Sequence, residues 1–196
     1  MIIDGKYAVE RVLGEGAMGI VYLAHDVITE TKVVIKSIRA EFADNPEFQA
    51  RAIEEGRVLA RIDHPNVVRL NAVVVEPGQL YLVMQYIEGN SLEKFLDAYR
   101  AQGTMVPLDE ALRIFRMIVQ GLAAAHREGV IHRDIKPANI LVRAKDGVVK
   151  ISDFGIAKTS DAIRTGRFKT LGVIGSPAYM APEQRRGERD LDRRAD

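Results

Sequence analysis

The hydrophobic pattern changes near residue 88, and this change constrains the fold more than any other feature. Before it, short runs rich in β-branched residues are separated by Gly or Pro, which is typical of strands. The predicted strands are "YAVERVLG" (7–14), "GIVYLAHD" (19–26), "TKVVIKSI" (31–38), "VVRLNAVVV" (67–75) and "LYLVMQYI" (80–87). After residue 88 longer apolar patterns at helical spacing predominate. The sequence therefore predicts an α+β chain with a hinge at 84–90.

Two helices are predicted from their first residues as well as from their spacing. One interrupts the strand-rich part: Asn45 is its N-cap, Pro46 lies in its first turn, and its apolar pattern continues to Ile62. The other follows the hinge as "SLEKFLDAYR", with Ser91 as the N-cap. The short stretch "EGN" (88–90) between the two parts is interpreted as a linker.

The longest helical pattern covers residues 109–128 and ends at Gly129, a residue typical of helix C-termini. Two short apolar runs follow, "NILVRA" and "VVKISD", and Asp146-Gly147 between them is a strong hairpin signal. The remaining residues resemble loops. The second part is therefore expected to be mainly helical, with one small hairpin.

The composition excludes several classes of protein. The 196 residues include no cysteine, which removes disulfides, thiolate metal sites and cysteine nucleophiles. A net charge of +1 gives no overall field that favours nucleic acid or a membrane surface. No run approaches the roughly 20 apolar residues needed to cross a bilayer, and the first residues lack the pattern of a signal peptide. We expect a cytoplasmic chain, which is compatible with a membrane anchor elsewhere in a longer protein.

The segment "GEGAMGIV" (14–21) has the pattern G-x-G-x-x-G-x-V. A glycine triplet alone often marks only a tight turn. In dinucleotide-binding folds the pattern follows a strand and opens a helix, but here Gly19 leads into the strand-like Ile20, Val21 and Tyr22. Two strands joined by glycines form a flap whose backbone amides can approach phosphates closely. The sequence therefore favours a phosphate-covering hairpin over a dinucleotide-binding turn.

Lys36 lies on the same face of its predicted strand as Val34 and Ile38, because alternate residues share a face. Its stem could simply cover apolar surface, as lysines at sheet edges often do. Glu55 favours another interpretation, because it lies within an apolar helical stripe, where an unpaired carboxylate is costly. The stripe consists of Phe48, Ala52, Leu59 and Ile62. We interpret Lys36 and Glu55 as an ion pair.

The densest polar cluster is "HRDIKPAN" (132–139), and "SDFG" follows it after the predicted hairpin. The cluster could be an ordinary solvated loop. Chain reversal at the hairpin, however, can bring Asp153 beside Asn139, and carboxylate and amide oxygens suit Mg²⁺. Asp134 could then orient an incoming hydroxyl group, and Lys136 could neutralise a transferred phosphoryl group.

These motifs, together with "VVIK" and "APE" (181–183), occur in the order typical of the eukaryotic-type (Hanks-type) protein kinase family, which the chain resembles over essentially its whole length. "HRDIKPAN" is similar to the serine/threonine class, and "VIGSPAYMAPEQ" is similar to bacterial receptor-type kinases. The resemblance implies a bilobal fold: a small antiparallel β lobe with one helix (1–86) and an incomplete, mainly helical large lobe (87–196). It also implies a protein serine/threonine kinase that uses ATP and Mg²⁺ to phosphorylate Ser and Thr hydroxyls.

The resemblance further implies a role for each matching residue. The catalytic set is Asp134 as the base, Lys136 at the γ-phosphate, Lys36 at the α- and β-phosphates, Glu55 as its partner, and Asn139 and Asp153 as ligands of Mg²⁺. The other ATP-binding residues are Leu13, Gly14, Gly16, Gly19, Val21, Val34, Met84, Gln85, Ile87 and Leu141. The regulatory spine is Leu59, Leu70, His132 and Phe154. His132 is thus expected to be structural, and His126 is assigned to packing.

The resemblance places an activation segment at 153–183. Within it, Thr170 is the expected phosphorylation site, with Arg133 as the cation for its phosphate. Ser176 matches a position that supports the catalytic loop. The implied partners are protein substrates, with neither nucleic acid nor membrane contact from this segment. A dimer in which activation loops are autophosphorylated is a further expectation.

Two functions other than kinase activity are compatible with parts of this pattern. A nucleotide-binding scaffold or inactive kinase fragment would perform no transfer, and the intact Lys36, Asp134, Asn139 and Asp153 argue against a scaffold defined by lost catalytic residues. Truncation of the domain could still give the same outcome. A small-molecule phosphotransferase of related fold would have another catalytic-loop pattern and no "APE" segment.

The final residues, "LDRRAD" (191–196), resemble the family pattern D-x-R-[SA]-D. Its last aspartate, here Asp196, hydrogen-bonds the backbone near the catalytic-loop histidine and arginine and begins the central helix of the large lobe. We therefore expect a fragment that is poorly stable or inactive by itself. It should expose the apolar face of the long helix, formed by Leu112, Phe115, Val119 and Leu122.

Overall fold

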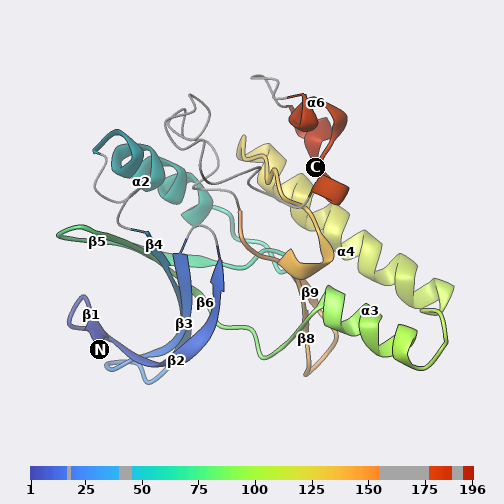
Figure 1. Ribbon diagram of the computed structural model, residues 1–196, viewed down its shortest axis with the longest axis horizontal. Coiled ribbons are helices and arrows are strands. Elements are labelled where there is room, and N and C mark those ends of the chain that lie inside the picture. Colours follow the sequence, from blue (N-terminus) through green and yellow to red (C-terminus); the bar gives the residue numbers. More distant parts are fainter. Residues whose placement is uncertain (17–18, 40–45, 155–176, 187–191) are drawn as a thin grey trace. The chain divides into compact units, whose positions relative to one another are not determined.

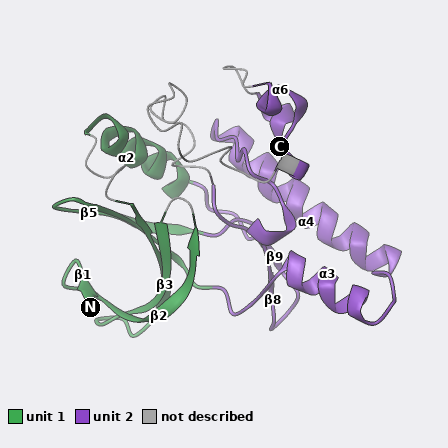
Figure 2. Cartoon of the chain, in the orientation of Figure 1, with its two compact units in different colours: residues 1–61, 69–86, 156–174 green, residues 62–68, 87–155, 175–196 purple. Residues whose placement is uncertain are grey.

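The computed structural model describes residues 1–16, 19–39, 46–154, 177–186 and 192–196 (Figure 1). Their contacts divide them into two compact units (Figure 2). Unit 1 contains the described residues of 1–61 and 69–86, and unit 2 contains 62–68, 87–154 and the described residues from 177 onwards. Each unit has its own core.

Unit 1 is built on an antiparallel six-stranded sheet with the order β1-β2-β3-β4-β6-β5. Its strands are β1 (Ile2–Ile3), β2 (Tyr7–Gly16), β3 (Gly19–Asp26), β4 (Lys32–Ile38), β5 (Leu70–Glu76) and β6 (Gln79–Gln85). All five strands expected in this part are present, with ends that shift by up to three residues. Sequential strands pair with their neighbours through short turns, because each connection except the one containing the helix is only a few residues long.

The two faces of this sheet carry different residues. One face packs a hydrophobic core, whose buried members are Ile3, Tyr7, Ala24, Val33, Ile35, Val74, Tyr81 and Val83. Direct cross-strand neighbours share a face, and neighbouring residues alternate between faces. Val34 and Lys36 of β4 therefore lie on the opposite face from Val33 and Ile35.

The helix α2 (Pro46–Ala60) covers this second face at β5. Three members of the predicted stripe, Phe48, Ala52 and Leu59, are buried in α2, and Ile62 is buried just beyond its end. The expected N-cap, Asn45, lies outside the described residues. Gly56 is also buried, and a Cβ atom there would meet Cγ2 of Val73 at 2.5 Å. The missing side chain at residue 56 thus lets the helix lie directly on β5.

Replacing Gly56 with Ala should destabilise the protein by about 1 kcal/mol. The gain in helix propensity of about 1 kcal/mol is outweighed by overpacking, which typically costs about 1–3 kcal/mol. Chemical denaturation measures the difference. In a Val73→Ala background, which removes the obstructing methyl group, the same substitution should be neutral or stabilising; an equal loss in both backgrounds contradicts the packing argument.

Unit 2 combines two helices with a small antiparallel sheet. Its helices are α3 (Leu92–Ala101) and α4 (Leu108–Arg127), and its sheet has the order β7-β8-β9, with β7 (Gly89–Ser91), β8 (Ile140–Arg143) and β9 (Val149–Ile151). Short helical turns follow at η1 (Pro137–Asn139), η3 (Pro177–Tyr179), α6 (Pro182–Arg185) and η4 (Arg193–Ala195). Ser91 caps α3 as expected, accepting a hydrogen bond from the backbone N–H of Lys94.

The segment interpreted as a linker, 88–90, contributes instead to strand β7. Gly89 and Asn90 pair with Arg143 and Val142 of β8. The linker interpretation was wrong for these residues because a three-residue strand has no periodicity of its own. Gly89 lies so close to the partner strand that a Cβ atom would meet the carbonyl oxygen of Val142 at 2.1 Å, and the glycine that looked like a linker residue permits this approach.

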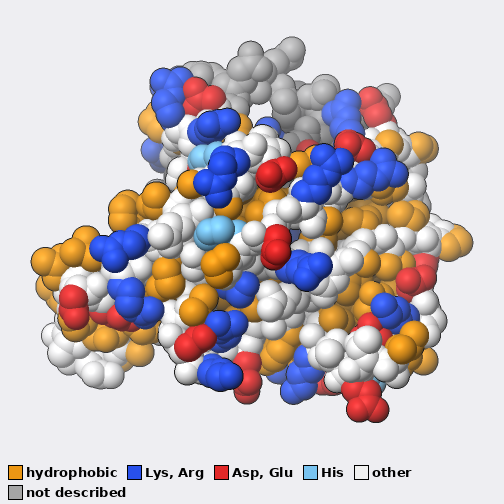
Figure 3. Space-filling view, turned by 180° about the vertical axis from the view of Figure 1, so that it is seen from behind, with side chains coloured by type: hydrophobic (Ala, Val, Ile, Leu, Met, Phe, Trp, Pro, Cys, Tyr) orange, Lys and Arg blue, Asp and Glu red, His pale blue; other side chains and the backbone are white. Residues whose placement is uncertain are grey.

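One face of the long helix α4 packs into the core of unit 2, and another face carries apolar side chains that are exposed to solvent. Ile114 is buried in a core with Ile140, Val149 and Ile151, and Leu122 packs against it. Leu112, Phe115 and Val119 are 53, 64 and 45% exposed. Figure 3 shows hydrophobic side chains gathered on unit 2 over α3 and α4. The expected exposure is confirmed for these three residues but not for Leu122, which lies toward the core. Within the described residues, no helix has both the length and the apolar character that a bilayer crossing requires.

Residues 62–68 connect α2 to β5, yet they belong to unit 2. Asn66 donates its side-chain amide to the carbonyl of Val149 at 2.8 Å, and its own carbonyl accepts the N–H of Ile151 at 2.9 Å. The buried Lys150 donates to the carbonyl of Val67 at 3.0 Å. Burial lowers the pKa of the Lys150 ammonium group. These bonds fasten the connecting segment to β9.

His64 makes this anchor sensitive to pH. Its Nδ1 accepts the backbone N–H of Asn66 at 3.1 Å, and burial, with smaller contributions from Arg127 and Lys150, lowers the pKa of His64. Protonation would remove the acceptor and add a third positive charge. Because the folded pKa is below the unfolded value of about 6.5, this contribution to stability is present above that pH and decreases as the pH falls.

The variant His64→Asn tests this effect, because an Asn oxygen accepts the N–H two residues on but does not titrate. Urea denaturation between pH 7.5 and 5.5 should show a steeper loss of unfolding free energy for the wild type than for the variant. Parallel pH profiles of the two proteins would rule out the role of His64.

Candidate active site

The glycine-rich segment forms a hairpin of two strands. Gly14 pairs with Val21 and Gly16 with Gly19, while residues 17–18 lie outside the described part. Gly19 has φ of 152°, and a Cβ atom there would meet the carbonyl oxygen of Ser37 at 1.6 Å. Only glycine fits this position. Since a strand follows Gly19, the hairpin prediction is confirmed and the dinucleotide-binding alternative is excluded.

Several of the expected ATP-binding residues lie on the face of the sheet that carries Lys36. Lys36 pairs directly with Val21 of β3 and with Leu82 of β6. Val34 pairs with Met84 in the same manner, one step further along the strands. Lys36, Val21, Val34 and Met84 therefore share one face, with Gln85 ending β6 and Leu13 exposed on β2. Ile87 and Leu141 belong to unit 2.

Glu55 lies on the helix that covers this same face. Its neighbour Gly56 touches Val73, and Val73 pairs with Leu82, which in turn pairs with Lys36. Strands in a sheet are about 4.8 Å apart, so Val73 and Lys36 are about 10 Å apart along this row. Both Lys36 and Glu55 are half-buried. This arrangement supports their pairing, which stays a prediction.

In unit 2 the polar side chains of the catalytic-loop motif converge. Asp134 Oδ2 lies 3.2 Å from Lys136 Nζ and accepts a hydrogen bond from Asn139 Nδ2 at 3.0 Å. Asn139 Nδ2 also donates to the Asp134 carbonyl at 2.8 Å. All three side chains are largely shielded from solvent. The motif is therefore a built cluster and not a solvated loop.

The same cluster has groups suited to Mg²⁺. In the described part of the chain both hydrogen bonds of the Asn139 side chain use Nδ2, which leaves its oxygen available to a cation. Ser152 donates both its N–H and its hydroxyl to the Asn139 carbonyl at 2.9 Å. Asp153 follows Ser152 directly in the chain. Within the described residues, no group of three His, Cys, Asp or Glu side chains could hold a metal alone. An Asn and an Asp completed by substrate phosphates fit the way Mg²⁺ is usually bound.

His132 has a structural environment, as expected from its predicted place in the spine. It is fully buried and its ring lies 4.6 Å from that of Phe154, centre to centre. Nε2 donates to the Ser152 carbonyl at 2.8 Å, and Nδ1 accepts the backbone N–H of Asp134 at 3.2 Å. Both ring nitrogens are thus used by the backbone. Burial lowers the pKa of His132, so the neutral ring persists. The other two spine residues, Leu59 and Leu70, are buried in unit 1.

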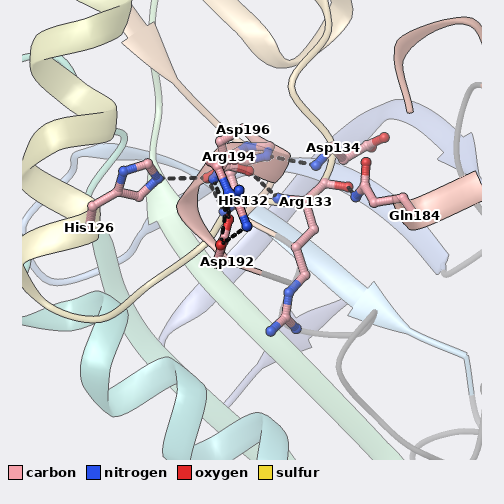
Figure 4. Close-up of polar contacts among 8 residues, drawn as sticks. All are labelled: His126, His132, Arg133, Asp134, Gln184, Asp192, Arg194 and Asp196. Atoms are coloured by element: carbon pink, nitrogen blue, oxygen red, sulfur yellow. Dashed lines mark hydrogen bonds and ion pairs between the residues drawn. The ribbon is translucent and has the colours of Figure 1, made fainter. Parts of the chain in front are cut away.

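Asp196 holds the backbone of the catalytic loop (Figure 4). Its side chain is fully buried and accepts the N–H of His132 and the N–H of Arg133, each at 2.7 Å. The contact expected from the resemblance of "LDRRAD" is confirmed. His126 Nε2 also donates to this carboxylate at 2.9 Å, a role that sequence reasoning missed by assigning His126 to packing. No local pattern could reveal it, because its partner lies 70 residues away.

The remaining expectations for the activation segment lie on residues that the structure does not describe. Thr170 and Ser176 lie within 155–176. At the far end of the segment, Gln184 of α6 donates its side-chain amide to the Arg133 carbonyl at 3.0 Å. This contact was not expected from the sequence.

These features are typical of protein kinases. Unit 1 has an antiparallel sheet that carries a lysine and a glycine-rich hairpin, and unit 2 has an Asp-Lys-Asn cluster. The profile described as "Protein kinase domain" matches residues 7–196. The chain belongs to the protein kinase family, which uses ATP as cosubstrate and Mg²⁺ as cofactor.

Named relatives and solved structures agree with this assignment. The serine/threonine-protein kinase PrkC of Bacillus subtilis is 40% identical over 185 residues, covering 94% of this chain and 28% of PrkC. The kinase PknA of Corynebacterium glutamicum is 37% identical, covering 95% of this chain and 39% of PknA. The crystal structure of the Mycobacterium tuberculosis PknI kinase domain superimposes with a TM-score of 0.77 at 31% identity, covering 100% of this chain and 71% of that chain. The chain thus spans well under half the length of these two curated relatives.

Proposed function

We propose that this chain is the catalytic part of a protein serine/threonine kinase that transfers the γ-phosphoryl group of ATP to Ser or Thr hydroxyls. The observation that carries the proposal is the cluster in which one Asp134 oxygen contacts both Lys136 and Asn139. Such a cluster presents a carboxylate, a cation and a metal-ligating amide within one loop. Bacterial Ser/Thr kinases as relatives support the class of substrate.

In the reaction, the hydroxyl oxygen of the substrate bonds to the γ-phosphorus and the bond from that phosphorus to ADP breaks. Asp134 orients the hydroxyl group and accepts its proton, while Lys136 neutralises the transferred group. Asn139 and Asp153 would hold Mg²⁺, which when bound offsets the charge of the phosphates. Holding these groups in a shielded loop positions the reactants before the reaction.

ATP binding is assigned mainly to residues of unit 1. Lys36 holds the α- and β-phosphates and is oriented by Glu55, and the hairpin at Gly14–Gly19 covers the phosphates. The adenine is framed by Leu13, Val21, Val34, Met84 and Leu141, with hydrogen bonds from the backbone of Gln85–Ile87. Leu59, Leu70, His132 and Phe154 are assigned to the regulatory spine of the family.

Substitution of Asp134 by Asn should abolish transfer of label from Mg-ATP to a generic protein substrate in the full-length gene product. Loss of a positioned proton acceptor typically costs about 10²–10⁴-fold. Lys36→Met and Glu55→Gln should also lower the rate strongly. Glu54→Gln is the matched control, because Glu54 is exposed and its recorded partner is Arg57 at 3.0 Å. Incorporation by Asp134→Asn equal to that of the wild type would refute the catalytic assignment and leave a nucleotide-binding scaffold.

Regulation by phosphorylation is proposed at Thr170, with Arg133 as the receiving cation. Within the described residues, Arg133 Nε is buried and has no hydrogen-bond partner, which is costly for a charged group. A phosphate supplies the acceptors that such a group lacks.

Mass spectrometry of the active protein should find phosphate at Thr170, and Thr170→Val should lower the transfer rate at least tenfold, the scale of one strong charge-assisted contact. Thr165→Val is the control within the same segment. Modification confined to Thr159 or Thr165 would exclude Thr170. We further propose that one copy of the protein phosphorylates the activation segment of another in a transient dimer. The initial rate of autophosphorylation should then rise with the square of the protein concentration.

A further inference from the structure

The backbone of Arg133 is held in an unfavourable conformation directly before Asp134. Its φ is 66°, in the left-handed region that non-glycine residues rarely adopt. Such a residue is strained and persists only where surrounding contacts determine its conformation. The contacts that fix Arg133 therefore also decide where the side chain of Asp134 points.

Those contacts lie on both sides of the residue. The N–H of Arg133 donates to Asp196 Oδ1 at 2.7 Å, and the carbonyl of Arg133 accepts Gln184 Nε2–H at 3.0 Å (Figure 4). The same peptide unit continues into the N–H of Asp134, which donates to His132 Nδ1 at 3.2 Å. Gln184 and His132 thus hold the two ends of the peptide plane that joins Arg133 to Asp134.

The amide of Gln184 is itself fixed at both ends. While Nε2 donates to Arg133, Oε1 accepts the backbone N–H of Ala181 at 2.9 Å, at the beginning of α6. The side chain is half-buried. An Asn side chain would be one methylene shorter, and Glu would keep the acceptor but lose the donor. The geometry therefore uses both functions of a glutamine amide.

We propose that Gln184 is a positioning residue for phosphoryl transfer: it links α6, at the end of the activation segment, to the peptide plane that orients Asp134. The inference rests on the proposed kinase function. Because Gln184 acts here through the Arg133 carbonyl and the Ala181 N–H, its loss should lower kcat and leave the KM for ATP unchanged. A residue that only caps α6 would alter stability without this separation.

Two substitutions separate the two functions of the side chain. Gln184→Glu retains the acceptor for Ala181 but places an oxygen against the Arg133 carbonyl. Gln184→Lys retains a donor for that carbonyl and removes the acceptor. Ser91→Ala, which removes the N-cap of α3, is a control for general helix destabilisation outside the active site.

In the full-length gene product, Gln184→Glu should lower kcat about tenfold, the equivalent of one lost hydrogen bond to a buried group, with the KM for ATP within about twofold of wild type. Gln184→Lys should keep most of kcat but melt earlier, as should Ser91→Ala. If Gln184→Glu has wild-type kcat, or if both variants lose kcat in proportion to their loss of stability, Gln184 is only a cap and the proposal is wrong.

Hydrogen exchange provides a readout that does not depend on activity. Peptides covering residues 132–135 should exchange faster in Gln184→Glu than in the wild type and remain protected in Gln184→Lys. Unchanged protection in Gln184→Glu would overturn the positioning role even if the protein is an active kinase. An inactive wild type with the expected exchange pattern would instead refute the proposed function and leave the contact supported.

Discussion

The arrangement of the catalytic loop depends on one buried carboxylate. Asp196 has no exposed side-chain surface and is satisfied by two backbone N–H groups of the loop and by His126. A buried carboxylate without such donors is strongly unfavourable, so the loop and the last residues form together or not at all. The left-handed backbone at Arg133 and the direction of Asp134 both follow from this attachment, whereas burial keeps the His132 ring neutral. Gln184 completes it from the side of α6.

Unit 1 shows how one sheet can serve two purposes. Its first face is a conventional apolar core, whereas its second face carries Lys36 in a row with Val21 and Leu82 beneath α2. The helix can approach this face because Gly56 has no side chain. The helix that bears Glu55 is therefore positioned by a glycine contact beside it, and the cost of glycine in a helix is offset by close packing.

Much of this could be predicted from the sequence because the signals were local. The strands of unit 1, the stripe on α2, the Ser91 cap and the hairpin at Asp146-Gly147 depend on spacing or turn chemistry within a few residues, and the structure contains them all. The prediction of a linker at 88–90 was wrong, and the contacts of His126, Gln184 and Gly56 were not predicted. Each of these depends on a partner remote in the sequence, which periodicity cannot report. The family resemblance supplied the contact between Asp196 and the catalytic loop, whose partners lie more than 60 residues apart in the sequence.

The segment 62–68 has a consequence for any attempt to separate the two units. The chain enters unit 2 at residue 62, returns to unit 1 at residue 69 and leaves it again after residue 86. A peptide that stops at residue 86 would keep Asn66 and Val67 but lose Val149, Ile151 and Lys150, to which they are bonded. The chain thus passes between the units three times over residues 61–87, and Gln85 donates its N–H to the carbonyl of Arg69 at 2.9 Å next to the second and third of these passages. The hydrophobic pattern of the sequence changes at one place, but each folded unit consists of separate stretches of the chain. Cutting the chain at a single position therefore cannot separate the two units.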